Sequence, residues 1–198
     1  SKQRVTPETM RLLMELAREC ELEAWRAQML TGKRINASED RAALHVALRA
    51  DAPVRFEGKD VTREVAAVLA DMRRFVRGLR AGRIRGATGR AFTDVLNLGI
   101  GGSDLGPRLA CDALKHCARN GPRAHFVSNV DGAAIAGALE RLTPASTLVV
   151  ISSKTFGTQE TLANARTARA WLEKKLKDKA GRHLCAVTAD PARALAFG

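Results

Sequence analysis

The chain contains no tyrosine, and only 4% of its 198 residues are aromatic. Basic residues outnumber acidic ones by 33 to 21, which gives a net charge of +12. Such an excess can bind a polyanion, but single-stranded nucleic acid is usually held on aromatic side chains that stack against its bases. Because the arginines are scattered and not interleaved with aromatics, we predict that nucleic acid is not a partner. Arg73, Arg77 and Arg80 fall on one face of an expected helix, and we interpret that face as solvated.

Cysteine is also scarce, and no C-x-x-C pair occurs. The four thiols are Cys20, Cys111, Cys117 and Cys185, each within an apolar pattern. This arrangement favours reduced thiols that pack inside the protein over a disulfide framework or a zinc site. We therefore expect a cytoplasmic protein with no bound metal.

Long apolar runs are missing as well. No uninterrupted apolar segment approaches the length needed to span a membrane, and the first residues lack the apolar stretch of a signal peptide. The sequence thus predicts neither a membrane partner nor secretion. With 45% hydrophobic and 27% charged residues, the composition is that of an ordinary folded protein.

The first part of the sequence predicts helices. One is expected from a Thr6-Pro7 start to a stop near Gly32, and a second from a cap within Asn36-Ala37-Ser38. A loop follows over 53–59, and a third helix is expected from about Asp60 to Leu79. Glycines then interrupt the pattern, so we predict a helical lead-in over residues 1–85.

From Thr93 onward, short apolar strands alternate with helices, which is typical of a parallel sheet with crossover helices. The expected strands are Val95–Gly99, His125–Ser128, Thr147–Ser152 and His183–Thr188. The expected helices are Leu105–Ala118, Gly132–Leu142 and Glu160–Lys177, with a further start at Asp190-Pro191 shortly before the last residue, Gly198. We predict an α/β domain over 86–198, a parallel doubly wound sheet that is truncated at its C-terminal end.

Two junctions between a strand and a helix have the composition of a phosphate site. The first strand runs into Gly99-Ile100-Gly101-Gly102-Ser103, and the third runs into Ser153-Lys154-Thr155-Phe156-Gly157-Thr158. Glycines let backbone N–H groups approach an anion, and the helix that follows directs its positive dipole end at the same place. Two such turns on one sheet predict a single phosphorylated ligand.

Known nucleotide motifs fit these turns poorly. The dinucleotide pattern G-x-G-x-x-G fails at Asp104, although Asp131 after the second strand keeps a dehydrogenase as a distant alternative. Lys154-Thr155 resembles the end of a P-loop, but the glycine frame before it is missing. A small phosphomonoester fits better, although Ser103 and Thr158 have the simpler alternative of capping helices.

The same turns carry a family resemblance. The segments Gly99–Pro107, His125–Gly132 and Ser153–Thr161, with Glu39–Arg49 upstream, resemble the glucose-6-phosphate isomerase family. The resemblance implies a sugar-isomerase (SIS) domain with a flavodoxin-like strand order, in an enzyme that interconverts glucose 6-phosphate and fructose 6-phosphate through an enediol. It implies no metal or other cofactor, and a homodimeric full-length protein.

The resemblance also assigns roles to residues. Those implied to bind the sugar phosphate are Gly101, Gly102, Ser103, Ser153, Lys154, Thr155, Phe156, Gly157 and Thr158, with Gly157 in place of the family's usual hydroxyl residue. The catalytic carboxylate, arginine, histidine and lysine of the family lie outside this sequence, so we expect no isomerisation by this chain alone. The histidines His45, His116, His125 and His183 match no catalytic motif and are expected in packing or surface roles. Glu160 is interpreted as an acid in the first turn of a helix.

One rival interpretation remains within the same fold. A regulator can carry a single SIS domain that senses a sugar phosphate without catalysis. A second isomerase domain would indicate the enzyme, and an attached DNA-binding domain would indicate the sensor.

Overall fold

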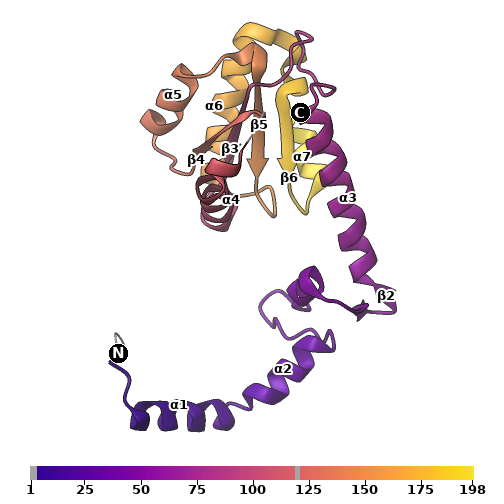
Figure 1. Cartoon of the computed structure of the whole chain (residues 1–198), viewed down its shortest axis with the longest axis vertical. Helices are drawn as coiled ribbons and strands as arrows, with labels where there is room; N and C mark the ends of the chain where they lie inside the picture. The colour runs from indigo at the N-terminus through magenta and orange to yellow at the C-terminus, as the bar shows by residue number, and fades with distance from the viewer. Residues whose placement is uncertain (1–3, 119–120) are drawn as a thin grey trace. The chain divides into compact units, whose positions relative to one another are not determined.

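A computed structural model describes residues 4–118 and 121–198 (Figure 1). The chain forms two compact units, Ser1–Arg73 and Arg74–Gly198. Helix α3 (Val61–Arg80) runs through the boundary between them. The domain boundary predicted at residue 86 falls inside the second unit.

The first unit opens with two helices, α1 (Pro7–Glu19) and α2 (Leu22–Leu30). The Thr6 hydroxyl caps α1 by accepting from the Thr9 N–H at 3.1 Å, and Pro7 occupies the first helical position, as predicted. The single helix expected up to Gly32 is wrong, because Glu21 adopts a left-handed conformation with φ 50° and separates the two helices.

The helix expected to begin near Asn36 is also wrong. Asn36 pairs with Arg41 across an antiparallel bridge, and the Ser38 hydroxyl donates to the Asn36 side chain at 2.8 Å instead of capping a helix. Only a short 3-10 helix, η1 (Leu44–Arg49), follows. Side chains that bond within the local turn give the backbone an alternative to helix, which accounts for the difference.

The loop expected over 53–59 contains a small hairpin, β1 (Arg55–Phe56) and β2 (Lys59–Asp60). Its two central residues, Glu57 and Gly58, have φ of 49° and 79°. Positive φ at both central residues is the geometry that two-residue hairpins prefer, because its twist matches that of the strands. The hairpin leads directly into α3.

The second unit is built on a four-stranded parallel sheet. Its strands are β3 (Asp94–Leu98), β4 (Arg123–Val127), β5 (Thr147–Ser152) and β6 (Leu184–Val187), in the order β4-β3-β5-β6. All four strands were expected from the sequence, and each observed end lies within two residues of the predicted one. The flavodoxin-like strand order is confirmed.

Helices connect these strands. They are α4 (Gly102–Ala113), α5 (Gly132–Glu140), α6 (Gln159–Leu176) and the final α7 (Pro191–Phe197), with 3-10 turns η2 (Lys115–Cys117), η3 (Pro144–Ser146) and η4 (Lys177–His183). Asp131 and Asp190 cap α5 and α7 through their carboxylates, which accept from backbone N–H groups at 3.0 Å. Helix α4 begins earlier than predicted, at Gly102, directly after the first glycine turn.

The core of this unit lies mainly on one face of the sheet. There the strand residues Leu96, Leu98 and Val149 pack among buried residues of α5 and α6. On the opposite face, Leu79, Phe92 and Leu148 form a smaller cluster. The Arg108 guanidinium of α4 lies 5.3 Å from the Phe126 ring. Phe126 of β4 is paired with Asn97 of β3, so the two side chains lie on the same face of the sheet. Because side chains alternate along a strand, that face is opposite to Leu96 and Leu98, and α4 packs on it.

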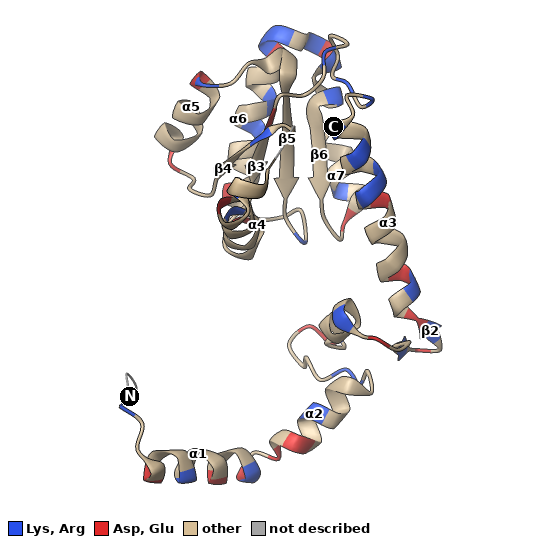
Figure 2. Cartoon of the chain, viewed as in Figure 1, with Lys and Arg blue, Asp and Glu red and all other residues tan. Residues whose placement is uncertain are grey.

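Figure 2 marks where charged residues occur along the chain, and most of those in the described ranges are exposed. Arg73, Arg77 and Arg80 of α3 are exposed, but Val68, Met72 and Val76 on its apolar face are exposed as well, so exposure does not distinguish the two faces. Lys174 and Lys175 stand in the last turn of α6, where the helix dipole favours positive charge. Within the described ranges, no helix has the length and apolar character needed to cross a membrane.

The cysteines only partly match the prediction. All four are free thiols, but Cys20, Cys111 and Cys117 are exposed and are not packed in a core. Only Cys185 is partly covered, and burial raises the pKa of its thiol. The apolar pattern around the other three belongs to helix faces that remain open in this structure.

Candidate phosphate-binding site

Both glycine- and hydroxyl-containing turns lie at the carboxyl edge of the sheet. We call residues 99–103 the first turn and residues 153–158 the second turn. They follow the adjacent strands β3 and β5, in which Leu98 pairs with Ile151. The chain passes from β4 on one side of β3 to β5 on the other, so the two turns flank the point where strand order reverses. Open α/β sheets bind ligands in the crevice at this point.

The first turn owes its shape to two glycines. A Cβ on Gly99 would lie 2.7 Å from the Ser103 carbonyl oxygen, so only glycine lets the chain turn back this tightly. Gly101 has φ 58° and ψ −122°, a conformation open essentially to glycine alone. Gly102 differs from both, because a Cβ there would meet nothing within 4 Å and its φ is not positive. The turn therefore leaves open space above Gly102.

The second turn is anchored by Phe156. Its side chain is 4% exposed and packs edge-on against Phe197, with ring centroids 5.7 Å apart. Its N–H donates to the Ser153 carbonyl at 3.1 Å, and its φ is 48°. Phe156 thus shapes the turn from inside the protein, while Lys154 and Thr155 are exposed.

The backbone of the second turn is also tied to the segment after β6. The Lys154 carbonyl accepts from the Ala189 N–H at 2.8 Å and from the Thr188 hydroxyl at 3.1 Å. The Thr155 carbonyl accepts from the Arg193 guanidinium at 3.4 Å. Arg193 was not expected at the site, and the only sequence signal for it was the helix start at Asp190-Pro191. A Cβ on Gly157 would lie 3.2 Å from the same guanidinium.

The hydroxyl groups of the two turns do not cap helices. Gly101 is the N-cap of α4, so Ser103 lies inside that helix, and Thr158 is the N-cap of α6 without a side-chain capping bond. The buried Ser153 hydroxyl donates to the Thr158 hydroxyl at 3.3 Å. The simpler alternative for Ser103 and Thr158 is therefore not what the structure shows.

A buried asparagine links the first turn to the end of β5, directly before the second turn. Asn97 of β3 is 8% exposed. Its Nδ2 donates to the Ser103 carbonyl at 3.0 Å, and its Oδ1 accepts from the Ser152 hydroxyl at 2.8 Å. Sequence reasoning missed this residue, although a single amide inside the apolar run Val95–Leu98 is a visible exception to the strand pattern.

Asp104 does not present a free negative charge to the first turn. It is 2% exposed, and its carboxylate accepts two hydrogen bonds from Arg108, at 3.1 and 2.9 Å. The bond to Asp104 raises the pKa of Arg108. Glu160 lies in the first turn of α6 and is exposed, in agreement with its interpretation as a helix acid.

The comparisons with known proteins agree with this geometry. The family model described as phosphoglucose isomerase matches residues 1–198. The chain belongs to the phosphoglucose isomerase family. It is 52% identical over its full length to glucose-6-phosphate isomerase 1 of Thiobacillus denitrificans and 51% identical to that of Cupriavidus pinatubonensis, and it spans 37% and 38% of their lengths.

A solved structure supports the same assignment. The glucose-6-phosphate isomerase of Chlamydia trachomatis superposes with a TM-score of 0.74 at 31% sequence identity, over 94% of this chain and 36% of that one. The phosphoglucose isomerase family and the α/β fold expected from the sequence are thus confirmed. The chain represents little more than a third of the proteins it resembles.

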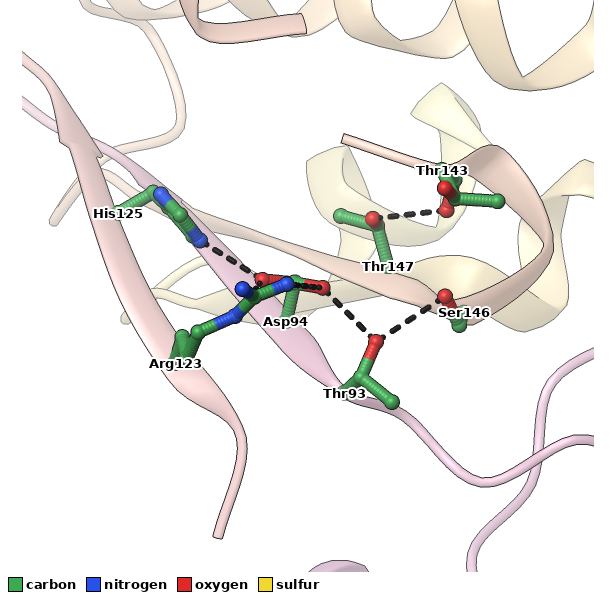
Figure 3. Close-up of polar contacts among 7 residues, drawn as sticks. All are labelled: Thr93, Asp94, Arg123, His125, Thr143, Ser146 and Thr147. Carbon is green, nitrogen blue, oxygen red and sulfur yellow. Dashed lines mark hydrogen bonds and ion pairs between the residues drawn. The ribbon is translucent and has the colours of Figure 1, made fainter. Parts of the chain in front are cut away.

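In this member of the phosphoglucose isomerase family, His125 and His183 form their hydrogen bonds with residues outside the two turns. His125 lies in the middle of β4, opposite Leu96, and its Nε2 lies 2.8 Å from Oδ1 of Asp94, the first residue of β3 (Figure 3). Arg123 donates to both oxygens of Asp94 at 2.9 and 3.1 Å, and the Thr93 hydroxyl donates at 2.8 Å. Burial raises the pKa of Asp94, but these hydrogen bonds outweigh burial and hold that pKa below its usual value. The cluster fastens β3 to β4.

The other histidines also fit the expected structural roles. His45 and His116 are exposed, and His183 is completely buried. Among the described residues, no group of three or more His, Cys, Asp or Glu side chains is placed to hold a metal ion.

Proposed function

We propose that this chain supplies the phosphate-binding turns of an enzyme that interconverts glucose 6-phosphate and fructose 6-phosphate. Its curated relatives carry the name glucose-6-phosphate isomerase. The observation that carries the proposal is the position of the two turns, which follow the adjacent, paired ends of β3 and β5 where the strand order reverses.

The phosphoryl group is proposed to lie between the two turns. The first N–H groups of α4 and α6 have no acceptor within their helices, so those around Gly101 and Gly102 are suited to phosphate oxygens. The hydroxyls of Ser103, Thr155 and Thr158 add donors that rotate to suit a tetrahedral anion. Ser153 supports them through its bond to Thr158.

The remaining predicted residues take different parts in this proposal. Lys154 is exposed on the second turn, where its ammonium adds positive charge near the phosphate. Phe156 shapes the turn from the core, and Gly157 offers backbone only.

We propose that this chain binds the phosphate of the sugar and does not supply the groups that catalyse the isomerisation. Moving a proton between C1 and C2 of the sugar requires a base and a group that stabilises the enediolate. His125 bonds Asp94, His183 bonds Thr147 and Ala87, and the Asp104 carboxylate is paired with Arg108. We assign catalysis, the cytoplasmic location and a homodimeric assembly to the longer enzyme of which this sequence is a segment.

A titration of the chain with glucose 6-phosphate, followed by amide NMR, tests the proposal. Saturable shifts are expected at both turns with the phosphosugar and not with glucose. The double variant Ser103→Ala, Thr155→Ala is expected to bind at least about tenfold more weakly, because it loses two hydrogen bonds to a charged group. A well-folded chain whose turn amides do not respond to glucose 6-phosphate would contradict the proposal.

A further inference from the structure

The Ser103 carbonyl has an unusual position in α4. In a regular helix this oxygen would accept from the N–H four residues later, but that residue is Pro107, which has no N–H. The ring of a proline inside a helix also crowds the carbonyl four residues before it. The Asn97 side chain supplies the donor that Pro107 lacks, at 3.0 Å.

At its other end, Asn97 bonds the residue that directly precedes the second turn. Its Oδ1 accepts from the hydroxyl of Ser152, the last residue of β5, at 2.8 Å. The Ser103 carbonyl needs a donor and the Ser152 hydroxyl needs an acceptor. The side-chain amide of Asn97 offers both on one planar group. Because Asn97 and Ser152 are buried, losing either bond would leave a polar group without water to replace it.

We propose that Asn97 is a positioning residue that sets the spacing between the two turns, so that one phosphate can be bound by both. Through the Ser103 carbonyl it fixes the start of α4, and with it the Ser103 hydroxyl and the Gly102 N–H. Through its bond to Ser152, it holds the start of α4 at a fixed position relative to β5, the strand that leads into the second turn. The inference rests on the phosphate-binding function proposed above. It also explains why Asn97 and Pro107 occur together, since Asn97 donates to the carbonyl that Pro107 leaves without a donor.

The substitution Asn97→Asp tests the donor half of this arrangement. An ionised aspartate still accepts from Ser152 but directs a negative oxygen at the Ser103 carbonyl. At about pH 8 we expect glucose 6-phosphate to bind at least about tenfold more weakly than to the unmodified chain. As the pH falls and the new carboxyl group protonates, it regains a donor, so the affinity ratio of variant to unmodified chain should rise toward one. Taking the ratio at each pH removes the ionisation of the phosphate itself.

Asn164→Asp is the matched control. Asn164 of α6 is 2% exposed, and its Nδ2 donates to the Asn129 carbonyl at 2.8 Å. It is thus another buried amide bonded to a backbone carbonyl, but its partner Asn129 follows β4 and belongs to neither turn. Helix α6 packs on the face of the sheet opposite to Asn97. Asn164→Asp should lower the unfolding midpoint and leave the affinity within about twofold. Equal loss of affinity in the two variants would overturn the positioning role.

A second measurement needs no ligand. Pro107→Ala restores an N–H four residues after Ser103, so the Ser103 carbonyl then has a donor within α4. We expect Asn97→Ala to lower the unfolding midpoint less in the Pro107→Ala background than in the unmodified chain. An equal loss in both backgrounds would overturn the link between Asn97 and Ser103, whereas failure of the unmodified chain to bind glucose 6-phosphate would contradict only the proposed function.

Discussion

At the scale of single residues, His183 illustrates a buried histidine with a structural purpose. Its side chain is completely buried, with Nδ1 2.8 Å from the Thr147 carbonyl oxygen. Its Nε2 accepts from the Ala87 N–H at 2.8 Å. These partners require the neutral ring with its proton on Nδ1. Gly86 must be glycine, because a Cβ there would overlap the imidazole ring. The histidine therefore ties the loop before β3 to the start of β5.

This arrangement predicts a pH dependence of stability. Burial lowers the pKa of His183 below its ordinary value of 6.5. Well above pH 6.5, His183 is neutral in both the folded and the unfolded chain. Below pH 6.5, the unfolded chain binds a proton at His183, whereas the folded chain does not until the pH falls to its lower pKa. The free energy of unfolding should therefore fall by up to about 1.4 kcal/mol per pH unit below about pH 6.5.

Urea unfolding at a series of pH values measures this slope, with His183→Gln as the control. Glutamine does not titrate, so its profile should lack this contribution even where the variant is less stable throughout. Parallel profiles for the two proteins over this range would show that His183 does not carry the dependence.

At the scale of elements, the turn between β3 and α4 contains glycines with two different roles. Gly99 is required by the fold, since its Cβ would meet the Ser103 carbonyl and side chain at 2.7 and 2.8 Å. Gly102 has neither a close neighbour nor a positive φ, and it opens a helix in which alanine is favoured over glycine. Under the proposed function, the approach of the phosphate to this backbone gives Gly102 the reason to be glycine that the fold does not supply.

Two alanine substitutions distinguish these roles. Gly99→Ala should lower the free energy of unfolding by about 1–3 kcal/mol, because the end of β3 and the first turn of α4 must separate. Gly102→Ala should leave it unchanged or raise it by up to about 1 kcal/mol, yet weaken the binding of glucose 6-phosphate by about tenfold or more, because its methyl group occupies the open space. Chemical unfolding and the NMR titration provide the two measurements. Unimpaired binding by Gly102→Ala would show that the phosphate does not approach this backbone.

The elements also show what the sequence could predict. The strands were found because each is a short apolar run buried in the sheet, and the two turns because glycine and hydroxyl residues follow two of those runs. The break at Glu21 was missed, since its left-handed conformation has no marker in the residue type. The contact of Asn97 with Ser152 and that of Arg193 with Thr155 were missed because these partners lie far apart in the sequence and come together only in the fold.

At the scale of the whole molecule, burial is distributed unevenly between the two units. Every member of the two core clusters belongs to Arg74–Gly198. In the part of the first unit that the structure describes, Ala47 is the one buried apolar side chain. Since buried apolar area is the main source of stability, we expect the second unit to fold without most of the first.

We therefore predict that a chain shortened to residues 61–198, with α3 intact, folds cooperatively and binds glucose 6-phosphate as the full chain does. A chain shortened further to 86–198 loses Leu79 and Ile84 from the second cluster and should be less stable by at least about 2 kcal/mol. Thermal unfolding and the titration of all three chains provide the comparison. If residues 61–198 fail to fold, the first unit contributes stabilising contacts beyond its buried side chains. If residues 86–198 prove as stable as 61–198, the end of α3 adds nothing to the core, and the isomerase domain begins at the boundary that the glycines near residue 86 predict.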